Sequence, residues 1–360
     1  MKDKMIKIVT FHNAHNFGAV LQCYALKTAI KNLDRKCEVE NVVNQKINDM
    51  YKPQIGLKKK SLAGLAKSII AYPTRKKGYD VFEDFISKRI LDKSADWDCK
   101  DADTIYISGS DQVWNWEMTD FDKTYFLDFV KMPESKNAYS ASFGFDEIPA
   151  EYQDEYKRLL GDFNKISVRE QQGADILKKL LGREVPVTLD PSMLLTEDNW
   201  RQFAETERKR KKEYILLYLM SETKSLIEFT RKLKKATGLD VIYINNSLWN
   251  RKRGFKYKSY ISPEEWVRLF LNARYVVTNS FHGTAFSINF NKDFFAGLLP
   301  STSKVNSRIE NILKKFGLED RLVSNVLDAD LKKAIDYEKV NNIIKTERKK
   351  SLEFLESVVK

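Results

Sequence analysis

The sequence predicts an α/β protein made of two doubly wound domains that face each other across a cleft. Short runs rich in β-branched and aromatic residues alternate with helical patterns almost throughout the chain, and this alternation indicates parallel sheets covered by helices. The 360 residues exceed what a single core usually holds, which favours two domains. A turn-rich stretch, LDPSMLLTEDNW at 189–200, divides the alternation into two halves.

The first half contains five expected strands and five expected helices. The strands are short β-rich runs at 5–11, 37–43, 104–108, 137–143 and 166–168. The helices have apolar residues at helical spacing and span 19–31, 61–71, 79–89, 151–162 and 170–181.

The break at 189–200 marks the expected domain boundary. Pro191 argues against a central strand, and Thr196 followed by Asn199 is typical of a helix start. We expect an N-terminal domain over 1–190, a C-terminal domain over 191–328, and a C-terminal helix over 329–360 that packs back on the first domain. The later strands are expected at 214–219, 240–244, 275–278 and 293–297. The later helices are expected at 223–236, 263–272, 284–290, 304–316 and 330–358.

Composition narrows the class of protein. The chain is 42% hydrophobic and carries a net charge of +12, which favours anionic partners. Nucleic acid is not expected among them, because most basic residues are interleaved with acidic ones and no binding module for it is visible. The three cysteines lack the spacing of metal ligands, so no metal site is expected. The N-terminus lacks a secretory signal and no apolar run approaches about 20 residues, so we expect a cytoplasmic protein.

The loops after the strands are the candidate sites, because ligands bind beyond the carboxyl ends of strands in open α/β sheets. The loop after the first strand, TFHNAHNFGAV, brings Asn16 and Gly18 to the start of a helix. Free N–H groups at that start can bind an anion. The alternative is a capped helix after an ordinary loop.

The next such loop, ISGSDQVWNW at 107–116, places polar side chains beside tryptophan. Asp111, Gln112, Trp114 and Asn115 follow a strand directly. Polar groups beside an aromatic ring suit a sugar, since hydroxyls take hydrogen bonds and the ring face packs on C–H bonds. The alternative is a tight turn with an anchoring tryptophan.

Two later loops carry cationic or titratable side chains. Arg169, in SVREQQG, can bind a carboxylate or phosphate through two parallel hydrogen bonds, or can form an ordinary salt bridge with Glu170. His282, in YVVTNSFHGTAFSI, follows a strand where an imidazole can act as acid or base. Downstream, Arg308 near another helix start is a second candidate anion contact.

Taken together, these motifs resemble the polysaccharide pyruvyl transferase family. The ordered set covers most of the chain and reads HNFGAVLQCYAL, GSDQVWN, YSASFG, SVRE, LDPSMLL, SPEEWVRLFLNARYVVTNSFHGTAFSINFNKDF and NSRI. The resemblance implies a fold like that of GT-B glycosyltransferases, with two Rossmann-like domains. It also implies transfer of the three-carbon unit of phosphoenolpyruvate onto two hydroxyls of a sugar in a bacterial surface-polysaccharide precursor. That reaction forms a pyruvate ketal and releases phosphate.

The resemblance also implies roles for the loop residues. Arg169 would bind the donor's carboxylate or phosphate, and His282 would be the general acid. The rest of the donor site would comprise Asn16, Gly18, Ser280, Gly283 and Arg308. Asp111, Gln112, Trp114 and Asn115 would contact the acceptor sugar or shape the cleft. The reaction requires no metal or cofactor, because phosphoenolpyruvate is a substrate. The alternative enzyme is a GT-B-type glycosyltransferase that uses a nucleotide sugar.

A basic amphipathic stretch spans 51–79 and contains no acidic residue. Its apolar positions, at helical spacing, are Leu62, Leu65, Ala66, Ile69 and Ile70. Such a helix can lie on an anionic membrane, which would suit a lipid-linked oligosaccharide as acceptor. The alternative is a surface helix whose apolar face packs in the core.

Overall fold

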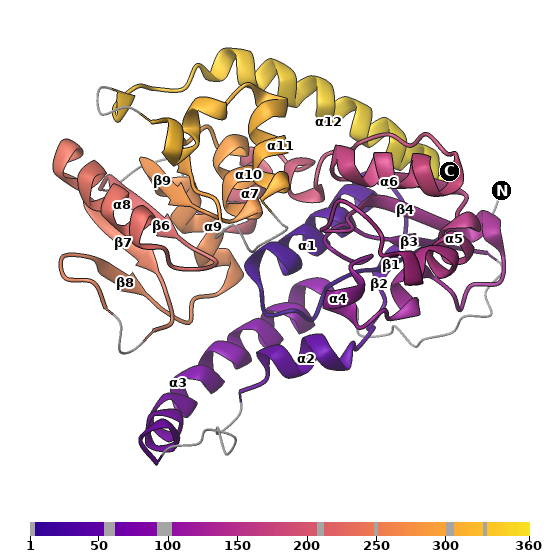
Figure 1. Ribbon diagram of the computed structural model, residues 1–360, viewed down its shortest axis with the longest axis horizontal. Coiled ribbons are helices and arrows are strands. Elements are labelled where there is room, and N and C mark those ends of the chain that lie inside the picture. Colours follow the sequence, from indigo (N-terminus) through magenta and orange to yellow (C-terminus); the bar gives the residue numbers. More distant parts are fainter. Residues whose placement is uncertain are drawn as a thin grey trace.

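The computed structural model describes residues 4–53, 62–91, 103–206, 212–247, 251–299, 306–326 and 330–360. It contains two five-stranded sheets in which every pairing is parallel. The first sheet has the order β2-β1-β3-β4-β5 and the second has the order β10-β9-β6-β7-β8. The predicted α/β class with two doubly wound halves is therefore confirmed (Figure 1).

The strands of the first sheet lie at the expected runs, although the second strand ends at Val39, four residues before its expected end. They are β1 (Met5–Val9), β2 (Cys37–Val39), β3 (Thr104–Ser108), β4 (Lys136–Ala141) and β5 (Lys165–Val168). Its longer helices are α1 (Phe17–Lys31), α2 (Gln45–Tyr51), α3 (Leu62–Phe85), α5 (Gln153–Gly161) and α6 (Gln171–Leu181). Every residue of β3 is buried, as expected for a central parallel strand covered on both faces.

The second sheet has one strand that the sequence analysis missed. Its strands are β6 (Tyr214–Tyr218), β7 (Asp240–Ile244), β8 (Lys256–Lys258), β9 (Tyr275–Thr278) and β10 (Asp293–Ala296). Its helices are α7 (Glu197–Phe203), α8 (Lys224–Thr237), α9 (Pro263–Asn272), α10 (Phe281–Asn289) and α11 (Ser307–Phe316). β8 reads Lys-Tyr-Lys and lies at the edge of the sheet with both lysines exposed. It therefore lacks the apolar signal of a strand.

Three helix assignments need correction, one of which is the helix expected at 330–358, since it begins only at Tyr337. The helices expected at 61–71 and 79–89 are one continuous helix, α3, which contains Pro73 and ends in a π-helical turn, Ile86–Ile90. Proline lacks the N–H that would donate to the carbonyl four residues earlier. That carbonyl belongs to Ile69, an exposed residue, so water can take the place of the missing donor. Helix α10 begins at Phe281 rather than at 284, because Ser280 caps it. The break at 189–200 contains a 3₁₀ turn, Pro191–Met193, and α7, which has a full capping box between Thr196 and Asn199.

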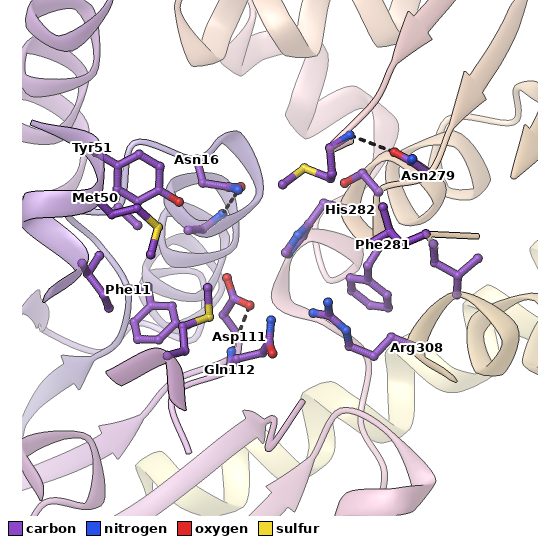
Figure 2. Close-up of a pocket in the computed structure, with 18 residues that line it drawn as sticks. Phe11, Asn16, Met50, Tyr51, Asp111, Gln112, Asn279, Phe281, His282 and Arg308 are labelled. Carbon is purple, nitrogen blue, oxygen red and sulfur yellow. Dashed lines mark hydrogen bonds between the residues drawn. The ribbon is translucent and has the colours of Figure 1, made fainter. Parts of the chain in front are cut away.

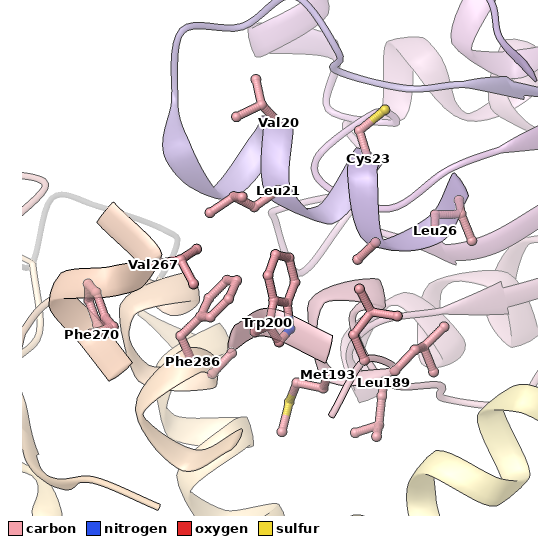
Figure 3. Close-up of a cluster of buried hydrophobic side chains, with 14 of the residues drawn as sticks. Val20, Leu21, Cys23, Leu26, Leu189, Met193, Trp200, Val267, Phe270 and Phe286 are labelled. Atoms are coloured by element: carbon pink, nitrogen blue, oxygen red, sulfur yellow. The ribbon is translucent and has the colours of Figure 1, made fainter. Parts of the chain in front are cut away.

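The two halves share one apolar core. α1 lies between the sheets (Figure 1). The ring of its first residue, Phe17, stacks on Trp266 of α9, with the ring centroids 5.6 Å apart. Figure 3 shows part of this cluster, whose labelled members come from α1, the segment 189–200, α9 and α10: Val20, Leu21, Cys23, Leu26, Leu189, Met193, Trp200, Val267, Phe270 and Phe286. The core fixes the carboxyl ends of the two sheets relative to each other.

The last helix, α12 (Tyr337–Val359), runs from the second half to the first (Figure 1). Near its C-terminal end, Lys165 of β5 donates to the carbonyl of Ser357. Further back, the Ser351 hydroxyl accepts from the backbone N–H of Leu189 at 3.0 Å. α12 thus ties the start of the 189–200 segment to the first sheet.

Candidate functional site

A cavity of about 240 Å³ lies where the carboxyl ends of the two sheets meet (Figure 2). Residues of the first half reach it chiefly from α2 and from the loops after β1 and β3, and residues of the second half reach it chiefly from the loop after β9, α10 and α11. The predicted site residues that line it are Asn16, Asp111, Gln112, Ser280, His282 and Arg308. The cavity is therefore at the place expected for open α/β sheets.

His282 lies in the first turn of α10, against the start of α1. Ser280 caps α10, and its hydroxyl accepts from the N–H of Gly283 at 3.2 Å. On the opposite side, a Cβ placed on Gly18 would lie 2.7 Å from Cε1 of His282 and closer still to two other ring atoms. Such separations are shorter than any van der Waals contact between carbons. Glycine at 18 therefore allows the imidazole to pack directly on the backbone of α1.

Asp190 connects the histidine to the rest of the site, and the sequence analysis did not single it out. Its Oδ2 lies 3.3 Å from Arg169 Nη1, 3.4 Å from His282 Nε2 and 3.1 Å from the Ser110 hydroxyl. Its Oδ1 accepts from both the N–H and the hydroxyl of Ser192. Burial alone would raise the pKa of Asp190, but His282, Arg169 and Ser192 hold it below its ordinary value.

Arg169 occupies a different position from the one expected. Its side chain is only 1% exposed and pairs with Glu170 and Asp190, and its guanidinium packs on the ring of Phe281 at 4.4 Å. It lines a second cavity of about 380 Å³ behind Phe281, and it is absent from the lining of the cavity that contains His282. The expectation that Arg169 contacts a donor in the same cavity as His282 is not supported, because its neighbouring carboxylates hold it behind Phe281.

Arg308 is the cation that lines both cavities. It comes from the first turn of α11, opposite Asp111 in Figure 2. Burial and the charge of Arg169 lower the pKa of Arg308 to about 10, against the attraction of nearby carboxylates. The guanidinium still carries its charge at neutral pH.

The charges of the site are close to balance. The carboxylates of Asp111, Glu170 and Asp190 face the guanidiniums of Arg169 and Arg308. Three carboxylates therefore surround two guanidiniums, and one of these carboxylates, Asp190, lies 3.4 Å from His282 Nε2.

The two predicted N–H donors, Gly18 and Gly283, are already occupied. The Asn16 side chain accepts from the N–H of Gly18 at 2.9 Å, and the Ser280 hydroxyl accepts from that of Gly283. In this structure both N–H groups are therefore satisfied within the protein, and their binding of an anion stays a prediction. The polar residues that precede the helices satisfy these donors, as N-caps commonly do.

The loop after β3 is only partly in the site. Asp111 and Gln112 line the cavity, and Asp111 has a left-handed backbone conformation with φ 76°. Trp114 is fully buried and packs on Phe126 and Phe143. Asn115 caps the short helix α4 (Trp116–Thr119).

The sugar contact expected for Trp114 and Asn115 is therefore wrong. The alternative of a turn with an anchoring tryptophan is what the structure contains. The aromatic signal was real, but it marks a core position.

Several cavity residues were not predicted. Tyr51, at the end of α2, and Phe281 line the cavity, and no strand-end motif announces Tyr51. Asn279 closes the gap between β9 and β6, since its side chain accepts from the N–H of Met220 and donates to the carbonyl of Ser221, both at 2.8 Å. The Asx-type position of Asn279, directly after a strand, was the available signal.

Comparison with known proteins identifies the family. The model of the polysaccharide pyruvyl transferase family matches residues 16–296. No curated protein matches the chain significantly. Within the described residues, no helix is long and apolar enough to cross a membrane, and no group of three or more His, Cys, Asp or Glu side chains is placed to hold a metal ion.

Comparison with solved structures finds a shared fold at low sequence identity. The UDP-GlcNAc 2-epimerase of Neisseria meningitidis, solved with UDP-GlcNAc bound, is 12% identical, with a TM-score of 0.50 over 98% of this chain and 99% of that one. A putative UDP-N-acetylglucosamine 2-epimerase of Listeria monocytogenes is 11% identical, with a TM-score of 0.49 over 94% of this chain and 90% of that one. Identities this low concern the fold alone. The family model, in contrast, matches residues 16–296, well over half of the chain, and this match shows that the chain belongs to the polysaccharide pyruvyl transferase family.

Proposed function

We propose that this protein transfers the three-carbon unit of phosphoenolpyruvate onto two hydroxyls of a sugar in a bacterial surface-polysaccharide precursor. The observation that carries the proposal is the cavity between the sheets, which brings His282 and Arg308 together on one side and Asp111 and Gln112 on the other. A titratable imidazole beside a guanidinium suits a donor that has an acid-sensitive double bond and two anionic groups. Family membership supports the same class of reaction.

The reaction balances as follows. A proton adds to the methylene carbon of the donor, and the first sugar hydroxyl bonds to the carbon that carries the phosphate. The C–O bond to phosphate then breaks, and the second hydroxyl bonds to the same carbon to close the ketal. The two hydroxyl protons replace the proton used at the methylene and protonate the released phosphate. In this scheme His282 delivers the first proton and Arg308 binds an anionic group of the donor.

Asp190 and Arg169 act one layer behind this chemistry. The Asp190 carboxylate lies 3.4 Å from His282 Nε2, where it stabilises the positive charge of a protonated imidazole. Arg169 pairs with the same carboxylate oxygen. In our proposal both residues position the histidine, and Arg308 replaces Arg169 as the direct donor contact.

The test is phosphate release from phosphoenolpyruvate by the purified protein, with saccharide-carrier lipids extracted from bacterial membranes as acceptor. We expect release that needs both substrates and that His282→Ala abolishes, together with a gain of a pyruvate ketal detected by mass spectrometry. A thermal shift with nucleotide sugars, and none with phosphoenolpyruvate, would instead identify a glycosyltransferase.

We further propose that α3 brings the protein to an anionic membrane at the cytoplasmic face. The apolar face that the alternative would pack in the core is exposed at Ile69 and Ile70, which are 53% and 60% accessible. Lys67 and Arg75 are exposed on the same helix, and basic groups beside apolar ones favour anionic lipid. The lysines at 58–60 lie outside the described residues.

Sedimentation with vesicles tests the membrane contact. Vesicles of phosphatidylglycerol and phosphatidylcholine should pull down the wild type at low salt, and the double substitution Ile69→Ser and Ile70→Ser should reduce binding. Val43→Ser, at an equally exposed apolar residue, is the control. Equal binding by all three proteins contradicts a contact through α3.

A further inference from the structure

A third cavity, of about 400 Å³, adjoins the cavity of His282. Met50 and Tyr51 line both cavities, so the two spaces meet at the end of α2. One wall is α3 and the other is the segment that leads from β7 toward α9, so each half of the molecule supplies one side. A ligand bound there would extend directly toward the proposed site of reaction.

Aromatic rings form the wall on the side of the first half. The ring of His15 lies 4.2 Å from that of Tyr79 and 5.2 Å from that of Phe82. Tyr51 also stacks on His15, with the two ring centroids 6.0 Å apart. Flat, rigid rings of this kind offer apolar contact area to the C–H face of a pyranose while their hydroxyls remain available for hydrogen bonds.

The polar lining suits a hydroxyl-rich ligand. Lys52, Arg75 and Asn246 contribute donors, and the described lining contains no carboxylate side chain. Burial and the nearby Asp111 raise the pKa of Tyr51, so its phenol stays protonated and can donate. Burial lowers the pKa of His15, so its imidazole, which contacts Glu83 at 2.8 Å, is neutral near pH 7.

Tyr260, on the opposite wall, is held in an unusual conformation. Its φ is 53°, in the left-handed region that side chains other than glycine rarely adopt. Asn246 fixes it twice, because its side chain accepts from the N–H of Tyr260 at 2.8 Å and its carbonyl accepts from the Tyr260 hydroxyl at 3.1 Å.

The ring of Tyr260 packs on the backbone of α3. It lies so close to Gly78 that a Cβ there would be 2.5 Å from Tyr260 Cδ1. Strained residues persist where their surroundings over-determine them, and they often mark ligand contacts. The strain and the close contact therefore both point to a defined surface on this wall.

From these observations we infer that the third cavity binds a pyranose ring of the acceptor, with Tyr79 and Tyr260 on opposite walls. The identity of the ligand as an acceptor rests on the proposed function, whereas the binding of a sugar ring here does not. The ligand class is a hexopyranoside without a cationic group, since the described lining offers aromatic faces and hydrogen-bond donors, Lys52 and Arg75 among them, but no carboxylate to pair with a cationic sugar. The chain of sugars would pass Tyr51 to place the reacting hydroxyls near His282.

Saturation-transfer NMR tests the inference without knowledge of the natural acceptor. The probes are methyl β-D-glucopyranoside, methyl β-D-galactopyranoside and their 2-acetamido forms, each at about 10 mM, because affinities of single sugars near the millimolar range correspond to only about 4 kcal/mol. At least one probe should receive saturation from the wild type. Tyr79→Ala and Tyr260→Ala should each weaken that probe's binding at least about tenfold.

Controls separate this inference from the proposed function. Tyr72→Ala removes the same side chain two turns earlier on α3, outside the cavity lining, and should leave probe binding unchanged. Arg75→Gln leaves every ring in place and should also weaken probe binding. It serves as the test if the alanine variants prove unstable. Phosphoenolpyruvate affinity, measured by calorimetry, should be equal in all variants.

Two results would overturn the inference. One is an absence of saturation with every probe. The other is probe binding that Tyr79→Ala, Tyr260→Ala and Arg75→Gln leave intact or that Tyr72→Ala reduces equally. Failure of phosphoenolpyruvate to bind the wild type would count against the proposed function and would leave the sugar result standing.

Discussion

Substitution of Gly18 by alanine should displace the imidazole of His282. The added methyl would lie 2.7 Å from Cε1 and closer to Nδ1 and Cγ, whereas carbon atoms normally pack at about 3.5–4.0 Å. The ring or the start of α1 must therefore move by about 1 Å. A shift of that size in a catalytic group costs about 100-fold in rate.

The stability of this variant follows from two opposing effects. Overpacking in a buried contact costs about 1–3 kcal/mol, and replacing glycine by alanine within a helix returns about 0.4–1 kcal/mol. The net result is a loss of up to about 2.6 kcal/mol. Gly161→Ala is the matched control, because Gly161 ends α5 with no atom within 4 Å of a built Cβ. It should be neutral or slightly stabilising.

The assay is the histidine ring region of the ¹H–¹³C NMR spectrum, together with phosphate release. The chain has only three histidines, so His282→Ala assigns the resonance directly. Gly18→Ala should shift the His282 signals much more than those of His12 and His15, and should slow phosphate release. An unchanged His282 resonance with wild-type turnover would refute the packing argument.

Three further predictions concern the same cluster and the core behind it. Asp190→Asn removes one of the carboxylates that pair with the buried Arg169 and should destabilise the fold by about 3–5 kcal/mol. Because the folded-state pKa of Asp190 is depressed, the stabilisation by this carboxylate is present above about pH 4 and is lost as the pH falls toward the folded-state pKa. The melting temperatures of the variant and the wild type should therefore converge at acidic pH. Phosphoenolpyruvate binding should largely survive His282→Ala, because Arg308 is the proposed contact of the donor's anionic group, while phosphate release is lost; loss of binding in His282→Ala would contradict these separate roles. Trp114→Ala should cost about 3–5 kcal/mol in urea unfolding while the folded fraction keeps wild-type affinity for phosphoenolpyruvate, and a specific loss of sugar binding would restore its original assignment.

Most of the fold could be predicted, because the buried strands of a parallel sheet are continuous apolar runs and the helices between them begin at recognisable capping residues. The run TIYIS is buried on both faces and matches β3 at both ends, and Ser262 followed by Pro263 announces the start of α9. β8 was missed because it is an edge strand of only three residues, two of them lysines, and so it lacks the apolar run that indicates a strand. The sequence analysis divided α3 into two helices on either side of Pro73. The sequence near a proline does not show whether the carbonyl that loses its hydrogen bond is exposed to water.

The site was predicted less completely, for a physical reason. A strand-end motif places a residue at the correct edge of a sheet, which is enough for His282 and Asp111, and a helix start was enough for Arg308. It does not show which way the side chain turns. Trp114 turns into the core, and Arg169 is held by carboxylates that approach from elsewhere in the chain.

The third cavity shows a further limit of sequence analysis. Its walls come from α2, α3 and the segment before α9, which are far apart in the sequence. Only packing between the two halves, visible in the contact of Tyr260 with Gly78, brings them together.

The most direct test of the account is calorimetric titration of phosphoenolpyruvate into the wild type, Arg308→Gln and Lys314→Gln. Arg308 lines the cavity of His282, whereas Lys314 is an exposed cation that lines only the second cavity. We predict binding by the wild type, a loss of about 1.5–3 kcal/mol for Arg308→Gln, and no loss for Lys314→Gln. Absence of binding by the wild type, or an equal loss in both variants, would contradict a donor site between His282 and Arg308.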